Sequence, residues 1–151
     1  MADKKLREFS YSPGYSDMRG AYHREFLKKN EKGEWVFVSE DCESINDPTI
    51  ITTYGVSLEA VTEFEKYLKD KDITSLKDRK DSDLFATDYS PWEYRIIYDD
   101  EADGRIRWDS NRISQYKDYS DQDIELLKEL NQRFRDLRGE QISQEIHKSR
   151  R

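Results

Sequence analysis

The stretch AYHREFLKKNEKGEWVFVSED, residues 21–41, decides the fold class. Its second half contains WVFV, in which aromatic residues alternate with valines, and this is the period of a strand with two different faces. Its two halves flank the polar segment NEKG, whose Gly33 can take the positive φ of a tight turn. The stretch therefore predicts an antiparallel hairpin made of residues 21–29 and 34–41.

Other stretches carry the signals of further strands and of helices. Alternating or β-branched residues predict strands at 7–12, 48–56, 83–88, 90–100 and 104–110. Apolar residues at helical spacing, with a serine available as cap, predict two helices at 57–71 and 120–138. We therefore expect an α+β fold, with an antiparallel sheet of five to six strands and both helices packed on it. Residues 1–139 are expected to form a single domain, and residues 140–151 a polar, basic C-terminal tail or a frayed helix.

The chain is poor in apolar residues and rich in charge. Of its 151 residues 34% are hydrophobic and 39% are charged, yet ten Tyr, six Phe and three Trp supply aromatic surface for a small core. The net charge is −7, and residues 31–103 hold twenty acidic against eight basic side chains. A surface of this sign repels nucleic acid and membranes and favours basic partners. We therefore expect no direct binding to nucleic acid or to a membrane.

The compartment is indicated by the cysteine content and by the lack of long apolar runs. The single cysteine, Cys42, cannot close a disulfide within the chain. The first residues, MADKKLREF, lack the apolar core of a signal peptide, and no run approaches the length of a membrane span. These features predict a cytoplasmic protein.

Residues 98–110, YDDEADGRIRWDS, are similar to the first half of a calcium-binding loop. The carboxylates that could bind a cation are those of Asp99, Glu101 and Asp103. Gly104 follows them, where such a loop turns sharply. However, the twelfth position holds Ser110 instead of a bidentate glutamate, and both flanks have strand character. We therefore favour a hairpin over a metal site, and we expect no metal and no other cofactor.

No catalytic motif stands out. The two histidines lie outside any recognisable motif, and acidic neighbours disfavour the thiolate form of the single cysteine. Asp83, Glu93 and Arg95 have a spacing like that of metal-dependent nucleases, but an arginine replaces the usual lysine and no basic DNA-binding face accompanies them. We assign no catalytic residue and favour a function other than catalysis.

The aromatic residues divide into candidates for the core and candidates for an interface. Because the chain is short of aliphatic residues, we expect its tryptophans, Trp35, Trp92 and Trp108, to be buried. Three tyrosines lie in polar surroundings and are the better candidates for contact with a partner. These tyrosines are Tyr15, Tyr116 and Tyr119.

Three segments occur in an order that resembles a set of small bacterial proteins of unknown function. The segments are FSYSPGYSDMRGAYHRE, DPTIITTYGVSLEAVTEFEKYL and SDLFATDYSPWEYRIIYDD. Proteins of that set combine a hairpin, a helix, a second strand pair that ends in a DDG turn, and a closing helix. The turn is lengthened here to DDEADG. The resemblance implies an α+β fold and transfers no functional residue.

The acidic centre and the lack of a catalytic motif favour a binding role. We expect a small acidic protein-binding or inhibitor module that acts on a basic partner such as a nucleic-acid-binding protein, by analogy with anti-CRISPR and other host-defence inhibitors. Two acidic blocks are expected to share one contact surface. Their residues are Glu40, Asp41, Glu43, Asp47, Asp99, Asp100, Glu101 and Asp103. The alternatives are a structural or assembly module that self-associates through its C-terminal helix and a small enzyme with an unrecognised site. We expect the protein to be a monomer or a homodimer.

Overall fold

The structure is a computed structural model, and it describes six segments of the chain. These segments are residues 5–13, 22–43, 47–77, 92–102, 105–114 and 119–148. The strands are β1 (Lys5–Ser12), β2 (Tyr22–Lys29), β3 (Trp35–Cys42), β4 (Thr49–Gly55), β5 (Glu93–Ala102), β6 (Arg105–Ser114) and β7 (Gln141–His147). The helices are α1 (Leu58–Asp70), the short 3₁₀ helix η1 (Ile73–Leu76) and α2 (Asp121–Arg135).

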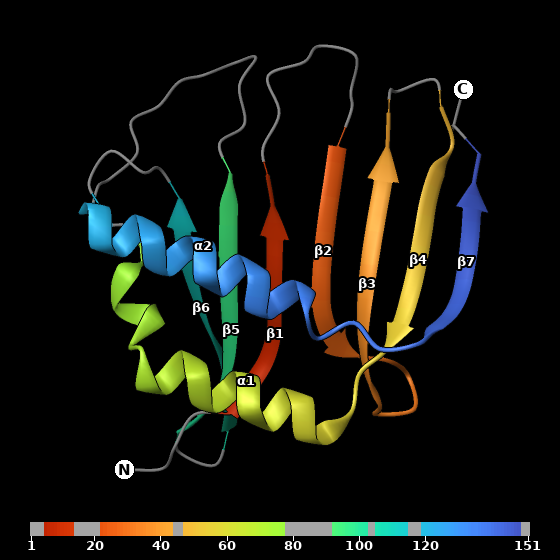
Figure 1. Cartoon of the computed structure of the whole chain (residues 1–151). Coiled ribbons are helices and arrows are strands. Elements are labelled where there is room, and N and C mark those ends of the chain that lie inside the picture. The colour runs from red at the N-terminus through yellow and green to blue at the C-terminus, as the bar shows by residue number, and fades with distance from the viewer. Residues whose placement is uncertain are drawn as a thin grey trace.

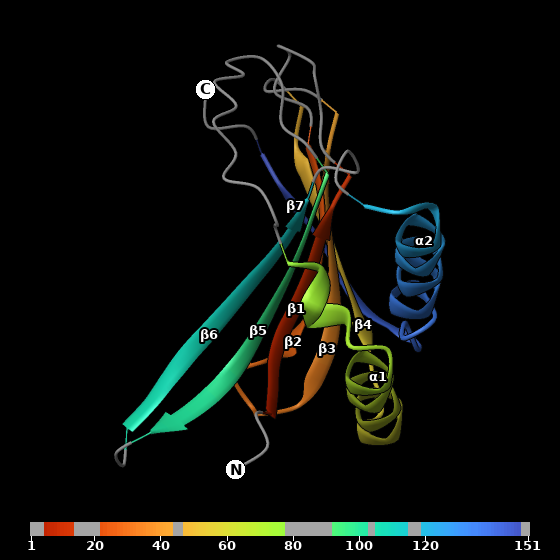
Figure 2. The ribbon, with the colours of Figure 1, turned by 90° about the vertical axis from the view of Figure 1, so that its left-hand side faces the viewer.

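All seven strands form one antiparallel sheet in the order β6-β5-β1-β2-β3-β4-β7. Both α-helices cross the same face of this sheet, as Figure 1 shows. Figure 2, turned by 90°, shows that the sheet is strongly twisted and that neither helix covers its other face. We call the first face the helix face and the second the open face.

The predicted α+β class is confirmed, and so is the predicted hairpin. β2 and β3 pair along their whole length, and Gly33 in the turn between them has a φ of 80°. The sheet has seven strands rather than five to six. The additional strand is β7, which lies in the segment that we expected to be a tail or a frayed helix. It pairs with β4, so the free backbone groups of β4 give order to a polar segment that has no apolar face of its own.

The hairpin of β5 and β6 is longer than the sequence indicated. Pairing continues to Ala102 and Arg105, so only residues 103 and 104 separate the two strands. An Asp-Gly pair between two strands is a typical short hairpin connection. The strand predicted at 83–88 lies outside the described residues.

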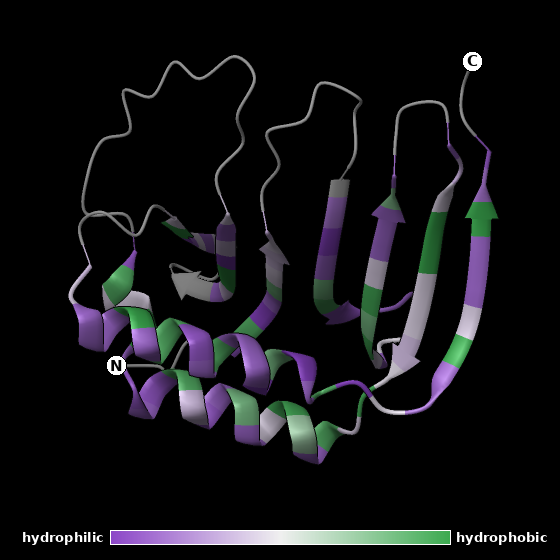
Figure 3. Cartoon of the chain, turned by 45° about the horizontal axis from the view of Figure 1, so that its top comes forward, coloured by the Kyte–Doolittle hydropathy of each residue, from purple (hydrophilic) through white to green (hydrophobic). Residues whose placement is uncertain are grey.

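Both α-helices begin at a serine, as predicted. The Ser57 hydroxyl accepts a hydrogen bond from the Ala60 N–H at 3.1 Å, and the Ser120 hydroxyl accepts one from the Asp123 N–H at 3.1 Å. Such N-terminal caps satisfy backbone donors that the helix itself leaves free. Hydrophilic residues dominate the outer sides of the helices in Figure 3, and their apolar sides pack on the sheet.

A cluster of phenylalanines joins the two layers. The ring of Phe134 in α2 lies 4.7 Å from that of Phe9 in β1 and 4.8 Å from that of Phe37 in β3, centroid to centroid. The ring of Phe64 in α1 is 6.2 Å away. These distances are in the range of favourable aromatic pairs, and Phe134 is completely buried.

The tryptophans do not all behave as predicted. Trp35 and Trp92 are partly buried against the core, but the side chain of Trp108 is 64% exposed. Trp108 pairs with Asp99 of β5, and both side chains project from the open face, where no helix covers them. The prediction that Trp108 is a core residue was therefore wrong, because the period of β6 alone does not say which of its faces receives the helices.

The connection from α2 to β7 depends on a close backbone approach. The Gly139 N–H donates to the Gly55 carbonyl at 2.9 Å, and the Gly55 N–H donates to the Glu140 carbonyl at 2.9 Å. A Cβ atom added at Gly139 would lie 2.5 Å from the Gly55 oxygen. The helix predicted at 120–138 already ends at Arg135.

We predict that Phe134→Ala destabilises the protein by about 3–5 kcal/mol, because it removes the ring that contacts both helix and sheet and leaves a cavity. Chemical denaturation followed by circular dichroism measures this loss. The exposed Leu58→Ala variant is the control and should unfold within about 0.5 kcal/mol of the wild type. Equal stability of Phe134→Ala and wild type would contradict the packing described here.

We also predict that Gly139→Ala destabilises the protein by about 1–3 kcal/mol, since the new methyl group meets the Gly55 carbonyl and forces the backbone apart. Gly33→Asn is the matched control. Gly33 has open space around it, and asparagine tolerates its positive φ better than most residues. Thermal unfolding of the two variants should therefore separate them, with Gly139→Ala melting first.

Candidate functional site

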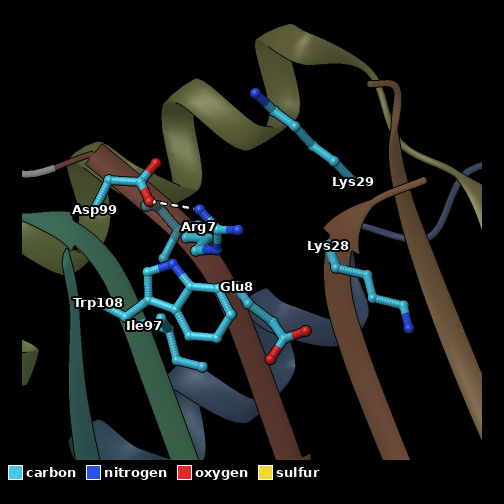
Figure 4. A pocket seen from close by; sticks show the side chains of 8 residues that line it. Arg7, Glu8, Lys28, Lys29, Ile97, Asp99 and Trp108 are labelled. Carbon is cyan, nitrogen blue, oxygen red and sulfur yellow. Dashed lines mark hydrogen bonds and ion pairs between the residues drawn. The ribbon is translucent and has the colours of Figure 1, made fainter. Parts of the chain in front are cut away.

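The open face of the sheet carries a groove that spans β2, β1, β5 and β6. Its floor is formed by Glu8 and Ile97, which are register partners. The side chains of Trp108 on one side and Lys28 on the other line its walls, as Figure 4 shows. The remaining lining residues are Leu6, Arg7, Lys29 and Asp99.

A β-bulge places Arg7 in this groove. The pairing of β1 with β5 shifts between Leu6 and Glu8, which makes Arg7 the additional residue. Leu6 and Phe9 can therefore both enter the core, although an odd number of positions separates them. The Leu6 N–H donates to the Glu65 carboxylate of α1 at 2.7 Å, so a helix side chain satisfies a backbone donor beside the bulge.

Arg7 is held by two partners. Its guanidinium donates to the Asp99 carboxylate at 2.8 Å, and its Cζ atom lies 4.3 Å from the centre of the Trp108 ring. Figure 4 shows the Arg7 side chain between these two residues. A guanidinium stacked on an indole and paired with a carboxylate restricts the orientation of both planar groups. The result is an exposed tryptophan that is already oriented.

The groove offers chemistry suited to binding. It presents an exposed aromatic surface together with donors from Arg7 and Lys28 and a carboxylate acceptor from Glu8. Among the lining residues that the structure describes, none is a Ser, Thr, Cys or His, the residue types that act as nucleophiles or transfer a proton near neutral pH.

The acidic residues predicted to form one surface are separated by the register of the sheet. Glu40 pairs with Arg24 on β2, at the end of the sheet where β5 begins at Glu93. Asp99 lies six residues further along β5, about 20 Å away along the strand direction at ~3.3 Å per residue. Glu40 and Asp99 therefore lie on the same open face but far apart along it, and whether the two acidic blocks serve one contact surface stays a prediction.

The individual acidic side chains have different surroundings. Glu40 accepts from the Arg24 guanidinium at 3.0 Å on the open face, whereas Asp41 points to the helix face. Glu43 and Asp47 are exposed near the same end of the sheet. For Asp100 and Glu101 only the backbone of β5 is described, and Asp103 lies outside the described residues. A role of these residues in binding stays a prediction.

One of the three tyrosines predicted for an interface is a core residue. Tyr119 is buried, and its hydroxyl donates to the Leu76 carbonyl at the end of η1. It fixes the chain just before α2, so a partner cannot reach it, and the prediction was wrong for this residue. The hydroxyl satisfies its hydrogen bond inside the protein, which a polar sequence neighbourhood does not reveal. Tyr15 and Tyr116 lie outside the described residues.

Two further expectations concern a metal and the C-terminal helix. Asp99, the first acid of the calcium-like stretch, lies in a strand and pairs with Arg7. Within the described segments, no group of three or more His, Cys, Asp or Glu side chains is arranged to hold a metal ion. The apolar stripe of α2 is buried in the core of its own chain, including Leu127, Leu130 and Phe134. That stripe is not available for self-association.

A charged cluster on the helix face was not foreseen from the sequence. The two ring nitrogens of His23 face two carboxylates: Nε2 lies 3.2 Å from Glu25 and Nδ1 lies 3.5 Å from Asp41. Glu25 is 3% exposed, and its second oxygen lies 3.8 Å from Nε of Arg135, at the end of α2. Alternation along β2 and β3 could have placed His23, Glu25 and Asp41 on one face, but it gave no reason to bring Arg135 there.

The cluster favours a protonated histidine. The hydrogen bond to Glu25 is the largest cause that raises the pKa of His23 above its ordinary value, and burial opposes it. The charge of Asp41 raises the pKa further. A protonated His23 and Arg135 together compensate the buried carboxylate of Glu25. The cluster therefore ties the end of α2 to the centre of the sheet.

Comparisons with known proteins give no further guide to the site. No family model, no curated protein and no solved structure matches this chain. Among the helices that the structure describes, none is long and apolar enough to cross a membrane. Function must therefore be inferred from the geometry of the open face and from the charge of the chain.

The raised pKa of His23 predicts a pH dependence of stability. Because the folded pKa exceeds the unfolded value of about 6.5, the contribution of His23 is complete below that value and disappears as the pH rises through the folded pKa. His23→Gln should therefore lose about 1 kcal/mol relative to wild type at pH 5.5, and much less at pH 9.

Denaturation curves of wild type and His23→Gln at several pH values measure this difference. Leu58→Ala is the control, because Leu58 is exposed at the start of α1, does not titrate and should change stability equally at both pH values. A wild-type advantage that is the same at pH 5.5 and at pH 9 would show that the charge of His23 does not stabilise the cluster.

Proposed function

We propose that this chain is a protein-binding module that recognises a basic protein through the groove on its open face. The observation that carries the proposal is the exposure of Trp108, 64% of whose side chain is accessible on a face that no helix covers. Large exposed aromatic residues are frequent anchors of protein interfaces. Arg7 holds this one in place, so little freedom of the indole is lost when a partner binds.

The free energy that burial of the Trp108 indole can contribute to binding is large enough for an interface anchor. Covering an exposed indole removes on the order of 100 Å² of apolar surface from water, which contributes about 2–3 kcal/mol. Arg7 and Lys28 on the same groove can donate hydrogen bonds to backbone carbonyls of the partner, and Glu8 can accept from a basic side chain. A peptide segment or a loop of a protein therefore fits this groove better than a small apolar molecule.

The net negative charge of the chain supports the proposal that the partner is a basic protein. A net charge of −7 attracts basic proteins over distances longer than any single contact and increases the rate of encounter. Acids lie towards both ends of the sheet: Glu43 and Asp47 are exposed at one end, and Asp99, half-buried and paired with Arg7, lies towards the other. Acids at both ends of the groove's face suit a nucleic-acid-binding protein, whose basic surface the module would cover and thereby inhibit.

We predict that Trp108→Ala weakens binding to the partner by about tenfold or more, as the loss of an interface anchor does. The partner is first captured with the tagged wild-type chain from cells of the source organism, and its affinity is then measured with purified proteins. Leu58→Ala is the matched control, since Leu58 is 70% exposed at the start of α1 and lies outside the groove.

Two further measurements test whether the partner is basic, independently of whether the groove is the contact surface. Affinity should fall as the salt concentration rises, and DNA or RNA should compete with the module for the partner. If Trp108→Ala and Leu58→Ala bind equally well, the groove is not the contact surface. If binding does not depend on salt and nucleic acid does not compete, the basic nature of the partner is contradicted.

A further inference from the structure

β7 lies at the free edge of the sheet, and its outer backbone groups have no strand partner among the described residues. Such an edge is a template for another strand unless the sequence protects it with lysine, proline or a cover. β7, QISQEIH, contains neither lysine nor proline, its ionisable side chains are limited to Glu145 and His147, and all seven residues are exposed. β6 at the opposite edge, RIRWDSNRIS, contains three arginines that discourage pairing.

An apolar pair stands beside this edge on the helix face. Ile50 of β4 and Ile146 of β7 are register partners, and they are 37% and 65% exposed. In Figure 1 both helices lie over the other part of the sheet, and β7 extends beyond them. Figure 3 shows apolar bands on the otherwise hydrophilic β7. A strand added to β7 would cover an apolar surface as well as satisfy backbone groups.

The sequence of β7 is complementary to itself in one register. If two copies pair in antiparallel fashion about Ile146, the described residues that overlap are 144–148, and each Ile146 faces the Ile146 of the other copy. Glu145 and His147, which lie 3.7 Å apart within one chain, then face His147 and Glu145 of the second copy, so a carboxylate lies opposite an imidazole on each side of the axis. A register centred on Glu145 would place like charges opposite each other. These pairs of opposite residues therefore favour the register centred on Ile146 over the one centred on Glu145.

A register centred on Gln144 is less favourable, because it places Ile142 opposite Ile146. The pairing of β4 with β7 shifts between Thr53 and Tyr54, where Ile142 forms a bulge. The Ile142 side chain approaches Gly55 from the open face, with its Cδ1 atom 3.5 Å from where a Cβ would stand. Ile142 and Ile146 therefore project from opposite faces and cannot pack against each other.

We propose that two copies of this chain form a homodimer by antiparallel pairing of β7 with β7, centred on Ile146. The pairing joins the two sheets into one and places Ile50 and Ile146 of both copies in a continuous apolar row on the helix face. The proposal is independent of the groove on the open face, which stays accessible in such a dimer.

Sedimentation equilibrium of the full chain over a range of concentrations, from micromolar to about millimolar, tests this homodimer. Wild type should reach a dimer, and Ile146→Asp should weaken the dimer at least tenfold, because the substitution places two carboxylates against each other at the axis. Ile142→Asp is the matched control, since Ile142 is 63% exposed on the same strand but projects from the other face. It should leave the dissociation constant unchanged. Circular dichroism verifies that all variants are folded.

A charge exchange gives an independent readout of the register. His147→Glu places glutamates opposite each other and should weaken the dimer at pH 6, and Glu145→His in the same chain should restore it by reversing both partners. A wild type that stays monomeric at the highest concentration overturns the proposal. A dimer that Ile146→Asp leaves unchanged overturns the β7 interface, and a failure of the double variant to recover overturns the register.

Discussion

The contact of Phe134 with the sheet is the interaction on which the rest of the structure depends. This one ring touches Phe9 and Phe37, which lie on strands separated by β2, and it also lies near Phe64 of the other helix. In a chain with only 34% hydrophobic residues, aromatic rings supply much of the area that a few apolar positions must bury. Both helices are therefore concentrated on one face, and the opposite face is left without a cover.

The open face stays compatible with water because its charges are paired locally. Arg24 pairs with Glu40 at 3.0 Å, and Glu93 pairs with Arg95 at 2.8 Å and with Arg112 at 3.4 Å. Each exposed pair contributes little to stability. Their alternation of sign nevertheless disfavours non-specific stacking of one sheet on another. Trp108 is conspicuous on such a surface because it is a large exposed aromatic residue beside the charged side chains of Arg7, Glu8 and Asp99.

The sequence predicted most elements because each has a local signal. Serine caps, helical spacing and strand alternation located both helices and six of the strands. β7 has a weak signal of its own, since it is a polar strand ordered by the free edge of β4. The buried position of Tyr119 and the cluster of His23 with Glu25 and Arg135 depend on contacts between residues far apart in the sequence. No local pattern could have predicted them.

The groove is another feature that the local sequence pattern could not predict, because it depends on an irregularity within β1. Alternation along β1 would place Leu6 and Phe9 on opposite faces, and only the bulge at Arg7 reconciles them. The bulge is also what brings the guanidinium to Trp108. A strict period of two predicts neither the bulge nor the exposed tryptophan, although it correctly predicts that β1 is a strand.

The order of the strands has a consequence for the way the chain acquires its structure during synthesis. β1 to β4 are consecutive and adjacent, so they can assemble as soon as residues 5–55 have left the ribosome. At that stage both outer strands of the nascent meander, β1 and β4, lack their final neighbours. β5 closes one side only after residue 93 has been made, and β7 closes the other only after residue 141. Phe134 arrives between these two events, so until then α1 alone can cover the nascent meander, and its β4 edge stays open longer still. In this interval the meander is most vulnerable to aggregation and has most need of a chaperone.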